Sequence, residues 1–510
     1  MKKALLGGIL VIGAGYVGST MYFGSEAETQ FKKSITVIDQ ALQKQMVDLP
    51  EGPTFQLSLK DYDKGLLNSS AKLKINLDFA DMPTPIPMKN LTYDLNLNIS
   101  HGPFIMAIGK PGMAYASSSI SIPEKMLKMA KKQLSKDSTL PKLDLSLLIN
   151  LDESSRFVAK VDEFTVAPKK FPGKLFWKGM DVYYDISKDL SALKGAAVVN
   201  GLDLDSPFAN AVVSKIDMTY DLNATKYGLW VGSGTFDLPS IKVSTRGSTV
   251  FDISKLKFDS SANIHNGLLN LSMNTSFENV QAKDKSFGPA NIDFEFKNLD
   301  AKSFVKVQKT LQHLKNAKSL PKAQAKELMS DLNKQLPGLF ARGAQLSIKN
   351  FKFQMAEGLL AGNLDVNVPA GIKITQAIQL ADHVQAKGDL QMPTVLLDEM
   401  LIKQASRKIR HQQMLAKLNQ DKKQEAPQQS TMDESSAQGD VNAVNEPVVK
   451  LLSRAEINTL AQQKVQSQLK KLLDNQLLVK KSNSYIFKFN FDKGHLFING
   501  KPFSPELFNQ

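Results

Sequence analysis

Apolar and polar side chains alternate one by one through most of the chain after residue 50. In segment 91–99, leucine, tyrosine and isoleucine occupy every second position, with threonine, aspartate and asparagine between them. Successive side chains of a strand point to opposite faces, so the pattern predicts antiparallel strands with one apolar and one hydrated face. The same alternation recurs at residues 54–60, 72–79, 216–222, 269–273, 292–296, 363–368 and 485–491.

Other segments space their apolar residues three and four positions apart, which is typical of amphipathic helices. They lie at 123–135, 301–340, 394–418 and 448–480. Segment 421–446 is polar and lacks aromatic residues, a composition that predicts a disordered loop. These helices would either fill the apolar face of the sheet or leave part of it as an open groove. The pattern leaves both arrangements open.

The expected fold is α+β and β-dominated, with one N-terminal transmembrane helix followed by a large curved antiparallel β-sheet domain that has helices packed on or beside it. The predicted parts are a membrane anchor or uncleaved signal at 1–25, a β-rich periplasmic domain at 26–393 with helical insertions near 123–135 and 301–340, a helical region at 394–482 interrupted by the 421–446 loop, and a C-terminal β-hairpin at 483–510 that returns to the sheet.

The N-terminal segment has the length and flanks of a membrane span. Lys2 and Lys3 precede 22 uncharged residues, Ala4–Ser25, and a helix needs about 20 to cross the hydrocarbon core. Lysines before the span and glutamates after it favour a cytoplasmic N-terminus. Ser25-Glu26-Ala27 also resembles a signal-peptide cleavage site, so cleavage stays open, although the long apolar run favours a retained anchor.

The same segment contains a glycine pattern that is typical of dinucleotide-binding turns. Gly13, Gly15 and Gly18 have GxGxxG spacing, and Asp39 follows where such enzymes place a ribose-binding acid. A Rossmann domain needs alternating strands and helices after this turn, whereas the chain continues with one-faced strands. Glycine is also frequent in membrane helices, where small residues form packing faces. We therefore interpret the glycines as part of a membrane helix, which is compatible with a homodimer.

Composition narrows the chemistry further. The net charge of +14 comes from lysines scattered along the whole chain, without the arginine and aromatic clusters of a nucleic-acid groove. The absence of cysteine excludes disulfides, thiolate catalysis and cysteine-ligated metals. The six histidines are isolated, and no phosphate-binding loop, nucleophile elbow or HExxH motif occurs. We predict no catalytic residue, no metal site, no cofactor and no nucleic-acid partner.

Three short stretches of the chain form a recognisable series. Asp61–Leu77 has an aromatic-x-x-Gly segment, with Tyr62 and Gly65, that runs into a strand. Ser100–Phe104 is a His-Gly-Pro-Phe motif after a strand, and Phe491–Phe508 is a closing strand and turn; they contain His101, Gly102, Pro103, Phe104, Gly494, Asn499 and Gly500. In this order the stretches resemble the YdgA-like family of bacterial envelope proteins, domain-of-unknown-function family 945. The resemblance implies a one-pass inner-membrane anchor and a large periplasmic β-rich domain. It implies no catalytic residue, so these positions are expected to be structural.

The leading hypothesis is a non-enzymatic protein of the bacterial envelope, anchored in the inner membrane through residues 4–25, with the bulk of the chain in the periplasm. Its apolar sheet face would form a groove for a lipid or a strand of another envelope protein. One alternative is an NAD- or FAD-dependent oxidoreductase that uses the N-terminal glycines. Another is a periplasmic hydrolase whose site forms only in three dimensions.

Overall fold

The described part of the chain forms two compact units. The first contains the chain up to Phe353 together with Leu364–Gln385, and the second contains Gln354–Asn363 and the chain from Ala386 onward. A computed structural model describes residues 54–63, 68–78, 90–101, 104–105, 107–122, 124–170, 172–189, 191–315, 322–372, 377–424 and 452–503.

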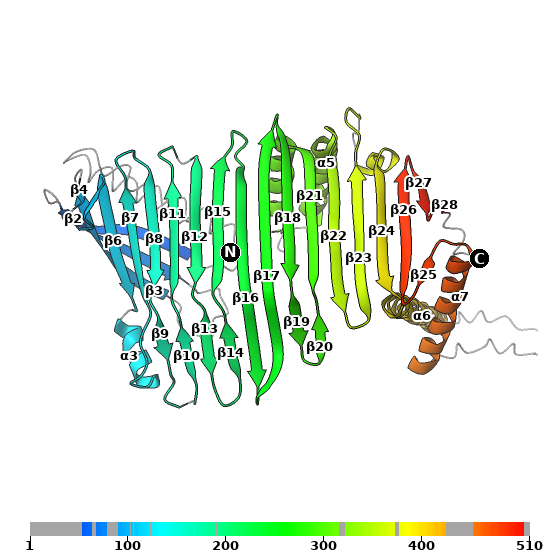
Figure 1. Ribbon diagram of the computed structural model, residues 1–510, viewed down its shortest axis with the longest axis horizontal. Helices are drawn as coiled ribbons and strands as arrows, with labels where there is room; N and C mark the ends of the chain where they lie inside the picture. The colour runs from blue at the N-terminus through cyan, green and yellow to red at the C-terminus, as the bar shows by residue number, and fades with distance from the viewer. Residues whose placement is uncertain are drawn as a thin grey trace, which may run out of the picture. The chain divides into compact units, whose positions relative to one another are not determined.

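The first unit is built on one long antiparallel ladder (Figure 1). Each strand pairs with the next in this order: β1 (Thr54–Asp63), β2 (Asn68–Asp78), β3 (Asn90–His101), β6 (Ala114–Ser121), β7 (Lys142–Ile149), β8 (Ser155–Val161), β11 (Met180–Ile186), β12 (Ala192–Val199), β15 (Ile216–Ala224), β16 (Trp230–Thr245), β17 (Ser248–His265), β18 (Leu268–Phe277), β21 (Ala290–Asp300) and β22 (Gln345–Met355). The short strands β4 (Phe104–Ile105) and β5 (Lys110–Pro111) pair with each other.

A second ladder continues below the first in Figure 1 and shares the two longest strands, β16 and β17. Its order is β9 (Phe164–Val166), β10 (Lys174–Trp177), β13 (Leu202–Asp205), β14 (Asn210–Val213), β16, β17, β19 (Asn279–Ala282) and β20 (Lys285–Phe287). The chain passes between ladders at short breaks. Gly179 and Gly201 occupy two of them with φ of 102° and 113°, a region that favours glycine.

Two hydrophobic cores lie in the first unit. In the first core, buried side chains come from strands between β1 and β11, including Leu57, Leu73, Ile149 and Tyr184. The second core lies where α4 (Ala301–Lys315) and α5 (Lys322–Phe340) pack on the ladder. Both helices lie within the predicted segment 301–340. α3 (Glu124–Gln133) lies within the predicted segment 123–135, and a 3₁₀ helix spans Ala377–Asp382.

The second unit has cores of its own. Its helices α6 (Thr394–Gln424) and α7 (Arg454–Asp474) bury Ile409, Ile457 and Ala461 between them, and Val465 and Leu469 pack with Tyr485. Its strands include β25 (Val479–Lys481), β26 (Ser484–Asp492), β27 (His495–Ile498) and β28 (Lys501–Pro502). β23 (Gly358–Asn367) and β24 (Gln385–Pro393), like β22, cross the division between the units.

The helix boundaries differ from those expected. α6 continues to Gln424, four residues into the predicted disordered segment 421–446, because no glycine or proline interrupts its helix-forming residues there. α7 begins at Arg454 rather than 448, because Ser453 and Glu456 form a capping box. The helical region predicted to extend to 482 also contains β25. The C-terminal segment adds a third strand, β28, to the expected hairpin.

The structure confirms a β-dominated fold with a large antiparallel sheet and few helices. In the described ranges, no helix combines the length and the apolar character that crossing a membrane requires. The predicted span at 4–25, with Gly13, Gly15, Gly18 and the more distal Asp39, lies outside the described residues and stays a prediction.

Candidate functional site

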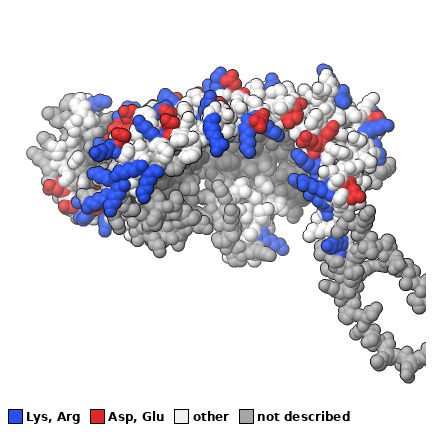
Figure 2. Space-filling view, turned by 90° about the horizontal axis from the view of Figure 1, so that it is seen from below, with Lys and Arg blue, Asp and Glu red and all other residues white. Residues whose placement is uncertain are grey.

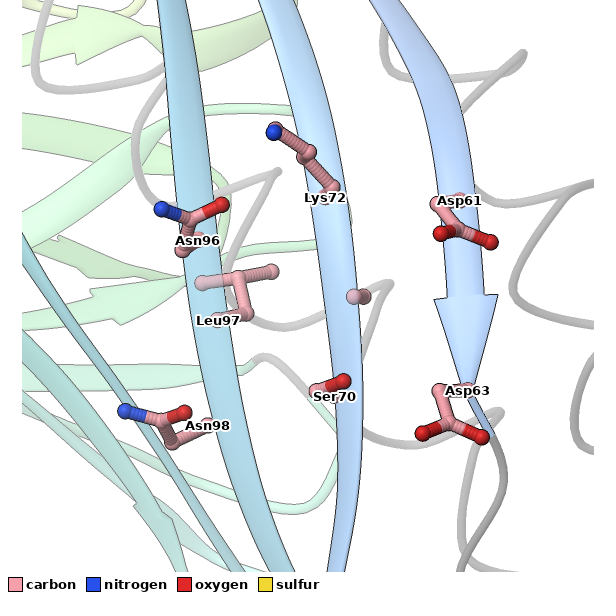
Figure 3. Close-up of a pocket in the computed structure, with 8 residues that line it drawn as sticks. Asp61, Asp63, Ser70, Lys72, Asn96, Leu97 and Asn98 are labelled. Atoms are coloured by element: carbon pink, nitrogen blue, oxygen red, sulfur yellow. The ribbon is translucent and has the colours of Figure 1, made fainter.

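A shallow depression of about 230 Å³ lies on the hydrated face of β1, β2 and β3 (Figure 3). Asp61 and Asp63 line it from β1, Lys72 lines it from β2, and Asn96 and Asn98 line it from β3. Alternation along each strand puts these polar side chains on one face. Both carboxylates are exposed.

The depression lacks a histidine. Its remaining lining residues are Ser70, Ala71 and Leu97, so the serine is not accompanied by the usual imidazole base. Across the described part of the chain, no three histidine, aspartate or glutamate side chains converge as metal ligands would. Because the two carboxylates stand on an open strand surface, we interpret the depression as part of the hydrated face.

The N-terminal family-motif residues occupy strands and strand ends. Tyr62 lies on β1 and packs, half-buried, against the first core. His101 ends β3 opposite Ala114, and Phe104 in β4 is opposite Pro111. Gly65, Gly102 and Pro103 lie outside the described residues.

The C-terminal motif residues form two tight turns. Gly494 has a φ of 79° between β26 and β27, and Asn499 and Gly500 have φ of 50° and 82° between β27 and β28. Asn-Gly is the preferred pair for a type I′ hairpin turn. The Asn499 side chain also accepts a hydrogen bond from the Lys488 backbone N–H at 2.8 Å and donates to the Gln476 carbonyl at 3.2 Å. This asparagine therefore connects the hairpin to the end of α7.

The hydrated face of the first unit is internally paired over its central strands. Lys257 on β17 lies 3.5 Å from Asp237 on β16, and the hydroxyl groups of Thr219 and Thr235 are 2.7 Å apart. Further along, Glu295 binds Lys297 at 3.0 Å and Lys349 at 2.8 Å, and these hydrogen bonds lower the pKa of Glu295, with Lys349 contributing most. Such exposed pairs are worth little individually, but they give several polar side chains of this face a partner.

The opposite, apolar face carries a registered strip of large side chains, which we call the central strip. Neighbouring strands place Phe236 opposite both Met218 and Phe258, Leu238 opposite Leu256, Ile241 opposite Ile253, and Val243 opposite Phe251. The central strip comprises Met218, Phe236, Leu238, Ile241, Val243, Phe251, Ile253, Leu256 and Phe258.

A backbone irregularity keeps the strip on one face. Lys255 on β17 has a φ of 53° and lies opposite Pro239 on β16. Before Pro239 the exposed residues Ser233 and Thr235 of β16 have odd numbers, and after it the exposed residue is Lys242. This change of phase brings Ile241 and Val243 onto the face of Phe236. The strip therefore continues from the long ladder into the second one.

The central strip lies between the two cores of the first unit. Of its members only Leu238 is buried, at 4% exposure, and the others are half-buried. None belongs to either core cluster. An aromatic group lies nearby in the ladder order, where Phe353 on β22 is 6.1 Å from the rings of both Phe277 and Phe287. Alternation predicted the apolar face, but it could not show which part lies outside the cores.

A second titratable site lies in the second unit and had no sequence signal. Asp398 on α6 is half-buried beside the Tyr485 hydroxyl on β26, and its Oδ1 is buried without a hydrogen-bond partner. Burial raises the pKa of Asp398, and the opposing effects of Tyr485 and Lys480 are smaller. Burial also raises the pKa of Tyr485. The pair connects helix α6 to strand β26. A carboxyl group and a phenol without a neighbouring nucleophile do not form a nucleophilic catalytic site, so we interpret the pair as structural.

We expect Asp398→Asn to raise the thermal midpoint of the second unit at pH 7. A carboxyl group whose pKa is raised on folding stabilises the fold fully below its unfolded pKa, near 3.8, and loses this contribution as pH rises through the folded pKa. Asparagine imitates the neutral form, so the gain should vanish as pH approaches 3.8. Circular dichroism at helical wavelengths across this pH range measures it. Glu399→Gln, at an exposed neighbour, is the control; a uniform loss of stability at every pH would contradict the assignment.

The comparisons with known proteins place the chain in a family. A family model described as a bacterial protein of unknown function, DUF945, matches residues 1–506. The chain belongs to this family. The match confirms the expected domain-of-unknown-function family 945 and extends over both units. No curated protein and no solved structure matches the chain. For this DUF945 protein, functional inference therefore depends on the geometry described above.

Proposed function

We propose that this DUF945 protein is a non-enzymatic, membrane-anchored protein of the bacterial envelope that holds a lipid acyl chain against the central strip. The observation that carries the proposal is the strip itself, a continuous apolar surface between the two cores whose side chains, apart from buried Leu238, are half-buried. The anchor would be residues 4–25, with the rest of the chain in the periplasm.

The dimensions of the strip suit an acyl chain. Seven residue steps separate Phe236 from Val243 on β16, which corresponds to about 23 Å at the rise of a strand. One leaflet of a bilayer's hydrocarbon core is about 15 Å thick, so an acyl chain would fit along the strip. The strip has no charged member and no catalytic group, which favours holding a ligand over transforming it.

Burial supplies enough free energy for such a ligand. Each methylene group removed from water contributes about 0.8 kcal/mol, so ten methylenes contribute roughly 8 kcal/mol. Association and chain ordering cost several kcal/mol of this gain. The balance is a reversible complex, which suits a protein that takes up and releases lipid.

A photo-crosslinking amino acid at Phe258 tests the proposal in the full chain. We expect irradiated cells to yield phospholipid adducts at this position, because the side chain would contact the bound acyl chain. The matched control is Ser261, an exposed position on the hydrated face of the same strand, where lipid adducts should be absent. Mass spectrometry identifies the adducts.

Two results would reject lipid binding. An adduct between position 258 and another segment of the same chain would show that the protein fills the strip itself. Equal lipid labelling at 258 and 261 would show only proximity to a membrane. A shift in circular dichroism for either variant would be checked first, so that a folding defect is not taken for loss of binding.

A further inference from the structure

Four hairpin turns of the first unit lie in one row at the lower end of the second ladder (Figure 1). They connect β9 to β10, β13 to β14, β16 to β17 and β19 to β20, and these strands are adjacent in that order. Successive turns are therefore two strands apart, or about 10 Å. We call the described residues of the four turns, 167–170, 172–173, 206–209, 246–247 and 283–284, together with α3, the lower edge.

The lower edge is strongly basic. Its sequence contains eight lysines and arginines against two carboxylates. The exposed cations include Lys170 in the first turn, Arg246 in the third and Lys283 in the fourth. Figure 2, viewed from below, shows lysine and arginine gathered most densely toward the left, with aspartate and glutamate interspersed along the rest of the molecule. Phe208 is 60% exposed at the second turn, within this row of cations.

Hydrogen bonds connect the end of α3 to the first turn of the row. The Lys169 ammonium group donates to the carbonyl oxygens of Lys131 at 2.8 Å and Lys132 at 3.3 Å. The Lys169 backbone N–H donates to the Gln133 carbonyl at 2.8 Å. Lys131 and Lys132 therefore stand beside Lys169 and Lys170 in a fixed arrangement, although like charges repel. A structure that holds these cations together suits an anionic partner.

The opposite edge of the same unit differs in charge. Its turns at 150–154, 187–191, 225–229 and 266–267 contain three carboxylates and two lysines. Several of these charges have partners within the edge. Glu153 pairs with Lys188 at 2.7 Å, and hydrogen bonds from Ser191 and Ser187 lower the pKa of Asp189 to about 2. Counted over the turns alone, the lower edge has four lysines and arginines against one carboxylate, so the net positive charge of the turns lies at that end of the strands.

We propose that the lower edge docks on the surface of a bilayer that contains anionic phospholipid. Each lysine or arginine near such a surface strengthens binding by about fivefold. An exposed phenylalanine among cations fits the boundary between headgroups and acyl chains, as in interfacial membrane-binding segments. A nucleic-acid groove would instead interleave cations with several stacking aromatics. The docking does not depend on whether the central strip holds a lipid.

Because the chain contains no cysteine, a single introduced cysteine can report docking by the full protein in vesicles. Ala209→Cys places a polarity-sensitive fluorophore beside Phe208, and Lys226→Cys places it at the opposite edge. Vesicles contain phosphatidylcholine alone or mixed with phosphatidylglycerol. We expect a blue shift and quenching by spin-labelled lipid at position 209 only with phosphatidylglycerol, reversed by high salt, and no change at position 226.

The triple variant K170Q/R246Q/K283Q should abolish the shift at position 209. The control K188Q/K194Q/K226Q, which removes the two lysines of the opposite edge and the exposed Lys194 of β12, should keep it. Lys169 is left intact because it holds α3. Equal emission in both vesicle types, or a shift that persists in the first triple variant, would overturn the proposal. A response to a short DNA duplex instead of the vesicles would also overturn it. If the first variant misfolds, the salt series on the otherwise unchanged chain decides the question.

Discussion

Replacing Leu269 with alanine is expected to destabilise the first unit by about 3 kcal/mol, within the range for leucines truncated in closed cores. Leu269 on β18 is 2% exposed and lies in the second core with Leu299, Val307 and Leu339. These neighbours come from the sheet and from α4 and α5, whose mutual packing includes a hydrogen bond from Thr310 to Gln335 at 3.0 Å. The cavity would therefore sit between layers that cannot close it without moving a helix.

Denaturant unfolding followed by circular dichroism measures this effect, and Leu311→Ala provides the matched control. Leu311 lies on α4 but is 48% exposed, so its truncation should cost less than about 1 kcal/mol. If both variants lost the same stability, the helices would not be packed on the sheet through Leu269. The comparison uses the same residue type, so differences in side-chain size do not enter.

Gly232→Ala should have a second large effect, a loss of more than about 3 kcal/mol. Gly232 lies on β16 with a φ of 145°, and an added Cβ would stand 1.9 Å from the Asp221 carbonyl oxygen. That carbonyl belongs to β15, which is registered against β16 at Leu222 and Gly232. Relief would require the two strands to separate four residues along from Met218 and Phe236 of the central strip.

Gly228→Ala separates the effect of the steric contact from the effect of the backbone conformation. Gly228 also has a positive φ, 76°, but a Cβ there meets no atom within 4 Å, so only the conformational cost of about 1 kcal/mol remains. Both variants are measured by thermal and denaturant unfolding. A Gly232→Ala protein as stable as Gly228→Ala would show that β15 and β16 tolerate separation. In the Gly232→Ala variant, the yield of lipid adducts at position 258 should fall only if the side chains of the central strip are displaced.

Local sequence was sufficient for several elements of this fold, although it did not single out the two longest strands, β16 and β17. Residues 91–99 alternate strictly and lie in β3, and the closing strand at 485–491 lies in β26. Asn499-Gly500 forms the expected turn because few other residue pairs adopt two positive φ angles without strain. The helix limits were less predictable, since α7 starts where Ser453 and Glu456 cap each other rather than where the apolar spacing begins.

The candidate sites were less accessible from the sequence. Alternation identifies an apolar face but carries no information about which strands of that face meet a second layer. The half-buried state of Phe236 and Phe258, and the burial of Asp398 beside Tyr485, depend on neighbours distant in the chain. The lysines likewise appeared scattered, because the positions that share the lower edge come from turns of which each lies 33 to 37 residues after the one before.

The sequence by itself determined one-faced strands and tight turns, because these depend on neighbours within a few residues. It also identified the family, through short motifs in a fixed order. Only the tertiary structure decided that two ladders share β16 and β17, that the central strip lies between closed cores, and that four turns align into one basic edge. These features arise from strand order and register. Register pairs residues that are far apart in the chain, so local sequence patterns do not reveal which residues will be paired.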